Sequence, residues 1–241
     1  MMKSNLAIIP ARGGSKRLKN KNTKLLCDRP LIVYSLEAVI ESNQFDSIIV
    51  TSDSDEILEL CKEYAGDRIR LHKRPDHLAT DTSTVLETVK VIADEEKNAG
   101  REYDVIGLFL PTAPLRTAKD VNEAMALLDE NTDSIVSITN YEFPPQLGLI
   151  KDKNELLCAY HESDPFRKEK TRSQDYEMIY RPNGAIYISW WEKFLTNKNF
   201  FKGTVGGYFM PREVSVDIDT EFDLVIASNI VKKFDLPLNT P

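Results

Sequence analysis

The chain has 241 residues, of which 41% are hydrophobic and 29% are charged, as in an ordinary globular protein with a substantial core. Its formal net charge of −7 argues against a general nucleic-acid binder or a protein of anionic membrane surfaces. The sequence contains no apolar run of membrane-spanning length and begins with no signal-peptide pattern, so we expect a cytoplasmic protein.

The first candidate functional segment is Leu6–Asn22, which reads LAIIPARGGSKRLKNKN. Seven of the 31 basic residues lie in the first 27 positions, ahead of the first acidic residue, Asp28. A strand that ends in a flexible cationic loop suits an oligophosphate, because glycines let backbone N–H groups approach and Arg and Lys neutralise the oxygens. The alternative is a solvated amino-terminal face, and the glycine pair inside the cluster favours anion binding.

Apolar runs and helical periods alternate along most of the chain. Strands are predicted at 6–9, 47–50, 69–71, 104–110, 134–139, 185–189 and 207–210, and helices at 31–40, 55–64, 84–97, 117–128 and from 220 onward. Thr117 and Asp120 resemble a capping box. This order predicts an α/β fold with a mostly parallel, doubly wound sheet and a site at the carboxyl ends of its strands. The basic loop, residues 52–53 and the loop 111–116 then share one rim.

The alternation fails between Asn140 and about Tyr180. This segment is polar, contains three prolines and carries the charge-dense piece DPFRKEKTR. It is either a surface excursion or, as is usual for loops of this length, a lid or a contact with another chain. We therefore expect one domain over residues 1–241 with an inserted segment at 140–180.

The three cysteines, Cys27, Cys61 and Cys158, are widely spaced and form no CxxC pair. They predict neither a disulfide framework nor a zinc site, and we expect buried free thiols in a reducing compartment.

The segment Asp217-Ile218-Asp219 is a candidate metal site. In extended backbone both carboxylates point to the same side, where they can bind Mg²⁺ and bridge it to the phosphates of a nucleotide. The alternative is that Asp219 or Thr220 only caps the last helix. The basic loop has neither Walker A nor GxGxxG spacing, which disfavours a P-loop enzyme and a nicotinamide dehydrogenase.

Six motifs in order resemble the cytidylyltransferases that activate sialic acid and related nonulosonic acids. They are IIPARGGSKRLKNKN, RPDHLATDTS, LPTAPLR, RPNGAIYI, a Phe-Phe pair and DIDTEFDL, and they extend from about Leu6 to Ile230. The resemblance implies a Rossmann-like nucleotidyltransferase with a small inserted dimerisation segment that forms a homodimer. It also implies a Mg²⁺-dependent reaction of CTP with a 2-keto sugar acid, which yields the CMP-sugar and pyrophosphate.

The same resemblance implies roles for single residues. Catalytic roles fall to Arg12, Lys16, Lys21 and Asp219, nucleotide binding to Arg12, Gly13, Ser15, Asn22, Arg74, Thr82 and Ser83, and metal binding to Asp217 and Asp219. Sugar binding falls to Arg172, Asn183, Tyr187, Phe200 and Phe201, with Arg172 reaching the sugar carboxylate from the partner subunit. From the residues alone, the Phe pair is equally typical of a buried core. Asn183 beside Gly184 is equally typical of a turn.

In the sialic-acid enzymes the third motif typically reads QPTSPLR, whereas this chain has Leu110 in place of the glutamine. The chain also has no lysine at 143–147, where a sialic-acid enzyme often has one. An apolar side chain cannot replace the hydrogen bonds of an amide, so sialic, legionaminic, pseudaminic and deaminated acids all stay open as acceptors. Three other functions are open: a nucleotidyltransferase for a sugar phosphate or an eight-carbon sugar acid, a metal-dependent glycosyltransferase, and a non-catalytic nucleotide-binding module.

Overall fold

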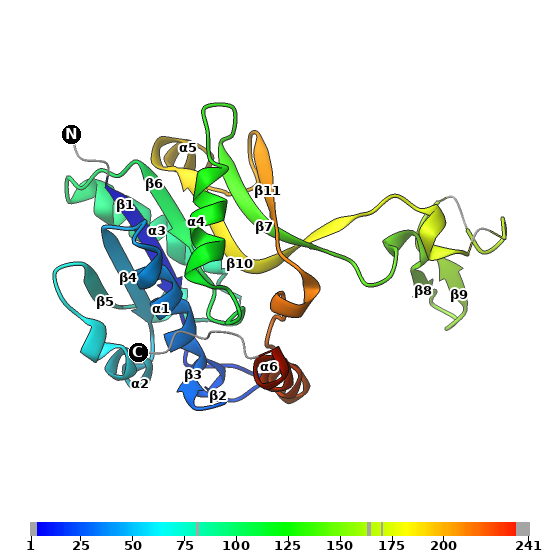
Figure 1. Cartoon of the computed structure of the whole chain (residues 1–241), viewed down its shortest axis with the longest axis horizontal. Helices are drawn as coiled ribbons and strands as arrows, with labels where there is room; N and C mark the ends of the chain where they lie inside the picture. The colour runs from blue at the N-terminus through cyan, green and yellow to red at the C-terminus, as the bar shows by residue number, and fades with distance from the viewer. Residues whose placement is uncertain (1–3, 81, 163–164, 170, 235–241) are drawn as a thin grey trace.

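The structure, a computed structural model, describes residues 4–80, 82–162, 165–169 and 171–234. Seven strands form one sheet in the order β11-β7-β10-β6-β1-β4-β5 (Figure 1). They are β1 (Asn5–Pro10), β4 (Ser47–Ser52), β5 (Ile69–Lys73), β6 (Val105–Leu108), β7 (Ser134–Asn140), β10 (Tyr180–Trp190) and β11 (Val205–Phe209). The neighbouring strands run parallel except for β10, which is antiparallel to β6 and β7. The predicted mostly parallel α/β sheet is confirmed.

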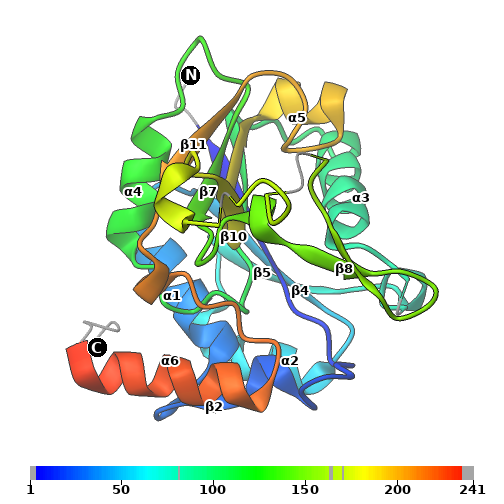
Figure 2. The ribbon, with the colours of Figure 1, turned by 90° about the vertical axis from the view of Figure 1, so that its right-hand side faces the viewer.

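Helices cover both faces of this sheet (Figure 2). They are α1 (Leu31–Ser42), α2 (Asp55–Leu60), α3 (Val85–Asn98), α4 (Ala118–Ala126) and α5 (Trp191–Asn197), whereas α6 (Glu221–Phe234) lies apart from the sheet. The side chains of α1, α2 and α4 join one buried cluster, whereas those of α3 and α5 join a second cluster on the opposite face. Burial on both faces explains why the parallel strands are continuously apolar in sequence.

The ends of the elements follow local chemistry. Thr84 with Glu87 and Thr117 with Asp120 form capping boxes that begin α3 and α4, and the second confirms the prediction. The predicted helix at 55–64 is shorter, because α2 ends at Leu60 and a 3₁₀ turn follows. The short helix α5 has no counterpart among the predicted elements.

Two additional small features lie outside the main sheet. The hairpin of β2 (Leu25–Leu26) and β3 (Arg29–Pro30) packs against α6, and together they enclose a third apolar cluster that includes Ile218. Residues 141–179, which we call the arm, leave the sheet after β7, return at β10 and carry the hairpin of β8 (Leu149–Lys151) and β9 (Leu157–Ala159) (Figure 1). The role of the arm as a lid or dimerisation segment stays a prediction.

The cysteines differ partly from expectation. All three are free, but only Cys61 is buried, whereas Cys27 and Cys158 are exposed. Cys27 lies in the turn of the β2–β3 hairpin and Cys158 lies on the arm, and neither position is covered by the core. Within the described residues, no helix has both the length and the apolar character that a membrane span requires.

Candidate active site

A cleft of about 390 Å³ opens where β1 and β6 end. The strand order reverses on either side of β1, and ligands of open α/β sheets bind at such a reversal. Seven of the predicted site residues line the cleft: Arg12, Lys21, Asn22, Arg74, Ser83, Asp217 and Asp219. The fold therefore brings the basic loop and the acidic pair together from opposite ends of the chain.

The basic loop is held in a tight conformation. The Gly13 N–H donates to Oδ1 of Asp53 at 2.9 Å, and a Cβ at Gly13 would approach Cβ of Ser54 to 2.8 Å. Only glycine fits this contact. The buried amide of Asn22 donates to the carbonyl of Arg12 at 2.9 Å, which makes Asn22 a brace for the loop as well as part of the cleft wall.

The acidic pair is anchored through the residue between its two members. Ile218 is fully buried, and its N–H donates to the carbonyl of Thr112 at 2.8 Å. Both flanking carboxylates consequently face the cleft, as the alternation of an extended segment predicts. Thr220 and Asp223 exchange hydrogen bonds at the start of α6, so the capping role belongs to Thr220.

Asp219, near the end of the chain, forms ion pairs with two cations of the basic loop at its start. Its Oδ1 lies 2.8 Å from Nζ of Lys21, and its Oδ2 lies 2.8 Å from a guanidinium nitrogen of Arg17. Sequence reasoning missed Arg17 as a site residue, although it stands in the same basic run as Lys16. The Asp219 carboxylate thus holds two cations of the basic loop at the edge of the cleft.

Asp217 has a different electrostatic environment. Its side chain is reached by solvent from the cleft, while the surrounding protein disfavours the charged carboxylate and raises its pKa. The nearby charge of Asp219 raises this pKa further, and a hydrogen bond with Thr112 works in the opposite direction. Sequence reasoning did not single out Thr112, whose place in the PTAP loop was the available signal.

The opposite wall of the cleft contains a buried cation. Arg74 is only 5% exposed, and its guanidinium donates to the Thr51 carbonyl at 2.9 Å, while its Nε has no partner within the described residues. Burial lowers the pKa of Arg74, and the charge of Asp53 partly offsets that effect. Ser83 lies on this wall too, whereas Thr82 does not line the cleft.

Several predicted site residues lie outside the cleft wall. Gly13, Ser15 and Lys16 belong to the adjoining loop, and Arg172 lies exposed on the arm. Phe200 is 2% exposed and belongs to the core, so the interpretation of this ring as core holds. Phe201 is 54% exposed, and its ring centroid lies 6.0 Å from that of Tyr187.

Asn183 has a structural role in place of the predicted sugar contact. Its Oδ1 accepts from Ser137 and from the Ala185 N–H, while its Nδ2 donates to Ser215 and to the sulfur of Met210. These bonds use the full capacity of the amide, which supports a register shift in β10 and leaves no atom for a sugar.

The residues of the cleft fit a magnesium ion. Mg²⁺ is commonly held by one or two carboxylates together with phosphates of the substrate, and Asp217 and Asp219 supply two carboxylates on one cleft. Their mutual repulsion, visible in the raised pKa of Asp217, is what a cation would relieve. Across the described part of the chain, no group of three or more His, Cys, Asp or Glu side chains gathers as a metal site.

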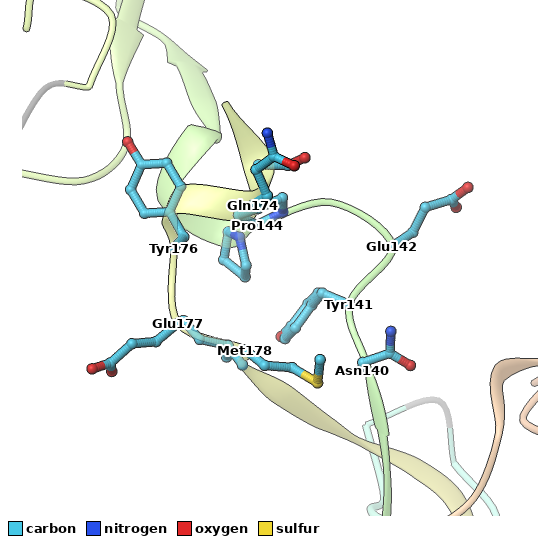
Figure 3. A pocket seen from close by; sticks show the side chains of 11 residues that line it. Asn140, Tyr141, Glu142, Pro144, Gln174, Tyr176, Glu177 and Met178 are labelled. Carbon is cyan, nitrogen blue, oxygen red and sulfur yellow. The ribbon is translucent and has the colours of Figure 1, made fainter. Parts of the chain in front are cut away.

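A second cavity lies at the base of the arm (Figure 3). It has a volume of about 320 Å³, and Tyr141, Pro144, Tyr176, Met178 and Ile179 line it. Figure 3 shows the Tyr141 and Met178 side chains facing one another across its floor. None of the predicted site residues lies in this cavity.

Comparison with solved structures places the fold among nucleotidyltransferases. The CMP:2-keto-3-deoxy-manno-octonic acid synthetase complexed with CTP gives a TM-score of 0.66 at 13% identity, over 96% of this chain and 100% of the other. The 4-diphosphocytidyl-2C-methyl-D-erythritol synthase of Anaerococcus prevotii gives 0.64 at 14% identity, over 95% of this chain and 96% of the other. At these identities the likeness shows the fold alone, and it confirms the Rossmann-like nucleotidyltransferase architecture.

A family model described as cytidylyltransferase matches residues 6–210, and the chain belongs to this family. The chain is 34% identical over 230 residues to the N-acylneuraminate cytidylyltransferase of Escherichia coli O18:K1:H7, a match that covers 95% of this chain and 52% of the relative. It is 31% identical to the pseudaminic acid cytidylyltransferase of Campylobacter jejuni serotype O:23/36 (95% and 96% covered) and 30% identical to the CMP-N,N'-diacetyllegionaminic acid synthase of Legionella pneumophila (94% and 96%). The chain thus spans about half the length of the first relative and nearly all of the other two.

Proposed function

We propose that the protein transfers CMP from CTP to a 2-keto sugar acid of the nonulosonic class and releases pyrophosphate. The observation that carries the proposal is the single cleft in which the basic loop meets Asp217 and Asp219. The named activities of the Escherichia, Campylobacter and Legionella relatives support the same substrate class.

The cleft offers the groups that this reaction requires. The anomeric hydroxyl of the sugar attacks the α-phosphorus in line, and Arg12 and Lys21 stabilise the charge that builds on the leaving pyrophosphate. Mg²⁺ held by the acidic pair would neutralise further phosphate charge. One of the two aspartates also helps to take up the proton of the hydroxyl.

We also propose that the protein is a homodimer joined through the arm. The arm exposes large apolar side chains that a monomer would leave in water: Phe143, Leu156, Leu157, Tyr160 and Met178 are each more than half exposed. A two-stranded hairpin such as β8–β9 is marginally stable without a further layer. A second copy would cover these side chains and would bring Arg172 toward the neighbouring cleft.

Free thiols support a reducing, cytoplasmic location.

The deciding experiment incubates the protein with CTP, Mg²⁺ and a panel of 2-keto sugar acids while pyrophosphate is recorded. Release that depends on a nonulosonic acid supports the proposal. Dependence on a sugar phosphate or an eight-carbon acid indicates another nucleotidyltransferase, and breakdown of a ready-made sugar nucleotide indicates a glycosyltransferase. Nucleotide binding without turnover of any substrate contradicts all of these enzymatic functions and indicates a non-catalytic nucleotide-binding module.

A further inference from the structure

The peptide group between Arg12 and Gly13 is clamped from two directions. Its N–H, on Gly13, donates to Oδ1 of Asp53 at 2.9 Å, and its carbonyl, on Arg12, accepts from the side-chain amide of Asn22 at 2.9 Å. Asp53 follows the end of β4, and Asn22 belongs to the 3₁₀ turn that closes the basic loop. A peptide plane that is held at both of its polar groups restricts the direction in which the Arg12 side chain leaves the backbone.

Asp53 continues the pairing of β1 with β4 by means of its side chain. Beyond the end of β1, the Ala11 N–H donates to the Thr51 carbonyl at 2.9 Å, as the parallel ladder requires. Two residues later, the Gly13 N–H meets the Asp53 carboxylate where a regular ladder would offer the Asp53 backbone carbonyl. That carbonyl instead accepts from Nζ of Lys73 on β5 at 2.8 Å. The sheet therefore determines where the basic loop starts.

The Asp53 carboxylate also offsets the charge of a buried cation. Arg12 and Arg74 both line the cleft, whereas Asp53 is not among the residues of the cleft wall. Burial lowers the pKa of Arg74, the charge of Asp53 opposes this effect, and the charge of Arg12 adds to it. Asp53 thus stabilises the charged form of Arg74 while its own carboxylate stays off the wall that a nucleotide would contact.

We propose that Asp53 is a positioning residue of the nucleotide site, because its hydrogen bond with the Gly13 N–H holds Arg12 toward the triphosphate. This inference rests on the proposed function and specifies how the chain holds CTP. The hydrogen bond needs an accepting oxygen and not its charge, so Asp53→Asn keeps the loop in place. Asp53→Ala removes the acceptor, and the loss of a hydrogen bond to a charged group corresponds to a factor of about 10 to 100.

The test compares Asp53→Asn and Asp53→Ala with the wild type and with the control Asp55→Ala. Asp55 has the same charge two positions later, but its side chain is 91% exposed and pairs with Lys73. Binding of CTP in the presence of Mg²⁺ is measured at equilibrium without any acid. Hydrogen exchange of a peptide that covers residues 9–18 is measured without nucleotide, which reads the position of the loop apart from activity. Thermal unfolding checks that each variant is folded.

We expect Asp53→Ala to weaken CTP binding by a factor of at least about 10 and to speed hydrogen exchange in this peptide. Asp55→Ala should match the wild type in both measurements. Asp53→Asn should keep the slow exchange and bind CTP no more than about twofold more weakly than the wild type. Unchanged affinity in Asp53→Ala overturns the inference. Equal losses in Asp53→Asn and Asp53→Ala also overturn it, because the charge and not the hydrogen bond would then matter.

Steady-state kinetics separate positioning of the nucleotide from a general loss of structure. With the best acid from the panel, Asp53→Ala should raise the KM for CTP by a factor of at least about 10 and leave the KM for the acid within about twofold. A fall in kcat with an unchanged KM for CTP contradicts the inference. If the wild type binds CTP but releases no pyrophosphate with any acid, the proposed function fails, and the comparison of CTP affinities still decides the role of Asp53. A wild type that does not bind CTP removes both.

Discussion

At the scale of single residues, the ion pair between Lys21 and Asp219 joins two segments that are 198 positions apart in sequence. Each partner has a second task in the proposed reaction, with Lys21 on the leaving pyrophosphate and Asp219 on the metal. We predict that Lys21→Ala and, separately, Asp219→Ala each lower the rate of CTP-dependent pyrophosphate release by at least about two orders of magnitude, as loss of one preorganised charge contact does. Steady-state kinetics with the best acid from the panel measures this rate.

The matched controls for this prediction are Lys19→Ala and Asp28→Ala, which remove the same charges at exposed positions outside the cleft. Both should keep near-normal turnover. If Lys21→Ala and Asp219→Ala also keep normal turnover, this cleft is not the reaction centre.

A second feature at the residue scale lies away from the cleft, on α3, where Glu96 is almost completely buried. Arg101 and Arg70 each form two hydrogen bonds with its carboxylate, and the hydroxyl of Tyr103 donates a further one at 2.7 Å. Burial by itself would raise the pKa of Glu96, but these donors outweigh it and hold the pKa at about 2. The cluster therefore ties α3 to β5 only while Glu96 is ionised.

This arrangement predicts a defined dependence of stability on pH. Because the folded pKa of about 2 lies below the ordinary value of 4.5, the contribution of Glu96 is complete above pH 4.5 and is lost as the pH falls toward 2. We expect Glu96→Gln to lower the free energy of unfolding by about 2–3 kcal/mol at pH 7. Urea titrations at pH 7, 5 and 3.5 should show the difference from the wild type shrinking at the lowest pH. A difference that is constant over this range would contradict the ionised cluster.

At the scale of elements, α4 illustrates how a short sequence signal determines where a helix begins. Its box of Thr117 and Asp120 satisfies two N–H groups, and the Tyr208 hydroxyl of β11 donates to Asp120 from the side. We predict that Thr117→Ala costs about 1 kcal/mol of stability, whereas Thr117→Ser, which keeps the accepting hydroxyl, costs less than half of that. Chemical denaturation compares the two variants, and equal losses would show that the cap hydrogen bond is not the cause.

The elements that the sequence predicts well are those whose signals are local. The strands β1, β4 and β6 are short apolar runs with strong turn residues after them, and their parallel pairing follows from the helices between them. The antiparallel direction of β10 was not predictable in this way. The chain re-enters the sheet at the end where β7 leaves it, since Tyr180 pairs with Asn140, and the sequence of the arm did not reveal at which end it would return. The short helix α5 was missed because Trp191 and Phe194 supply only one helical repeat.

The candidate site shows the same division. The cluster that contains Arg12 and Lys21 was found because positive charge is concentrated at the start of the chain. Asp217 and Asp219 were found because their spacing puts both on one side of an extended segment, and the fold puts all four in one cleft. Side-chain packing decides the rest. Asn183 and Phe200 face inward because Ser137, Ser215 and the α5 cluster surround them, and no spacing rule reveals that. Arg17, which was missed, differs from its neighbours in the loop only through the ion pair with Asp219 that forms after folding.

At the scale of the whole molecule, Arg172 lies on the arm and not among the residues that line the cleft. The arm projects beyond the sheet and the helices (Figure 1), and its apolar side chains are exposed. A homodimer with a two-fold axis would return each arm to the other subunit, since such an interface is made twice from the same surface. We predict that Leu157→Asp, which places a charge in this surface, yields monomers in sedimentation at micromolar concentration. The wild type should sediment as a dimer, and a wild-type monomer contradicts the proposed role of the arm.

If Arg172 acts across that interface, two inactive proteins must restore each other. In a mixture of Asp219→Ala with Arg172→Ala, a heterodimer has one cleft with an intact Asp219 and an intact Arg172 from the opposite subunit. Random exchange of subunits makes half of the dimers mixed, and each mixed dimer has one working cleft of two, so the expected activity is about a quarter of the wild type. Each variant alone should give only a small fraction of this. The recovery must follow the exchange of subunits, which unfolding and refolding the mixture accelerates. If Arg172 serves its own cleft, no arrangement of these subunits contains a complete site, and the mixture stays as inactive as its parts.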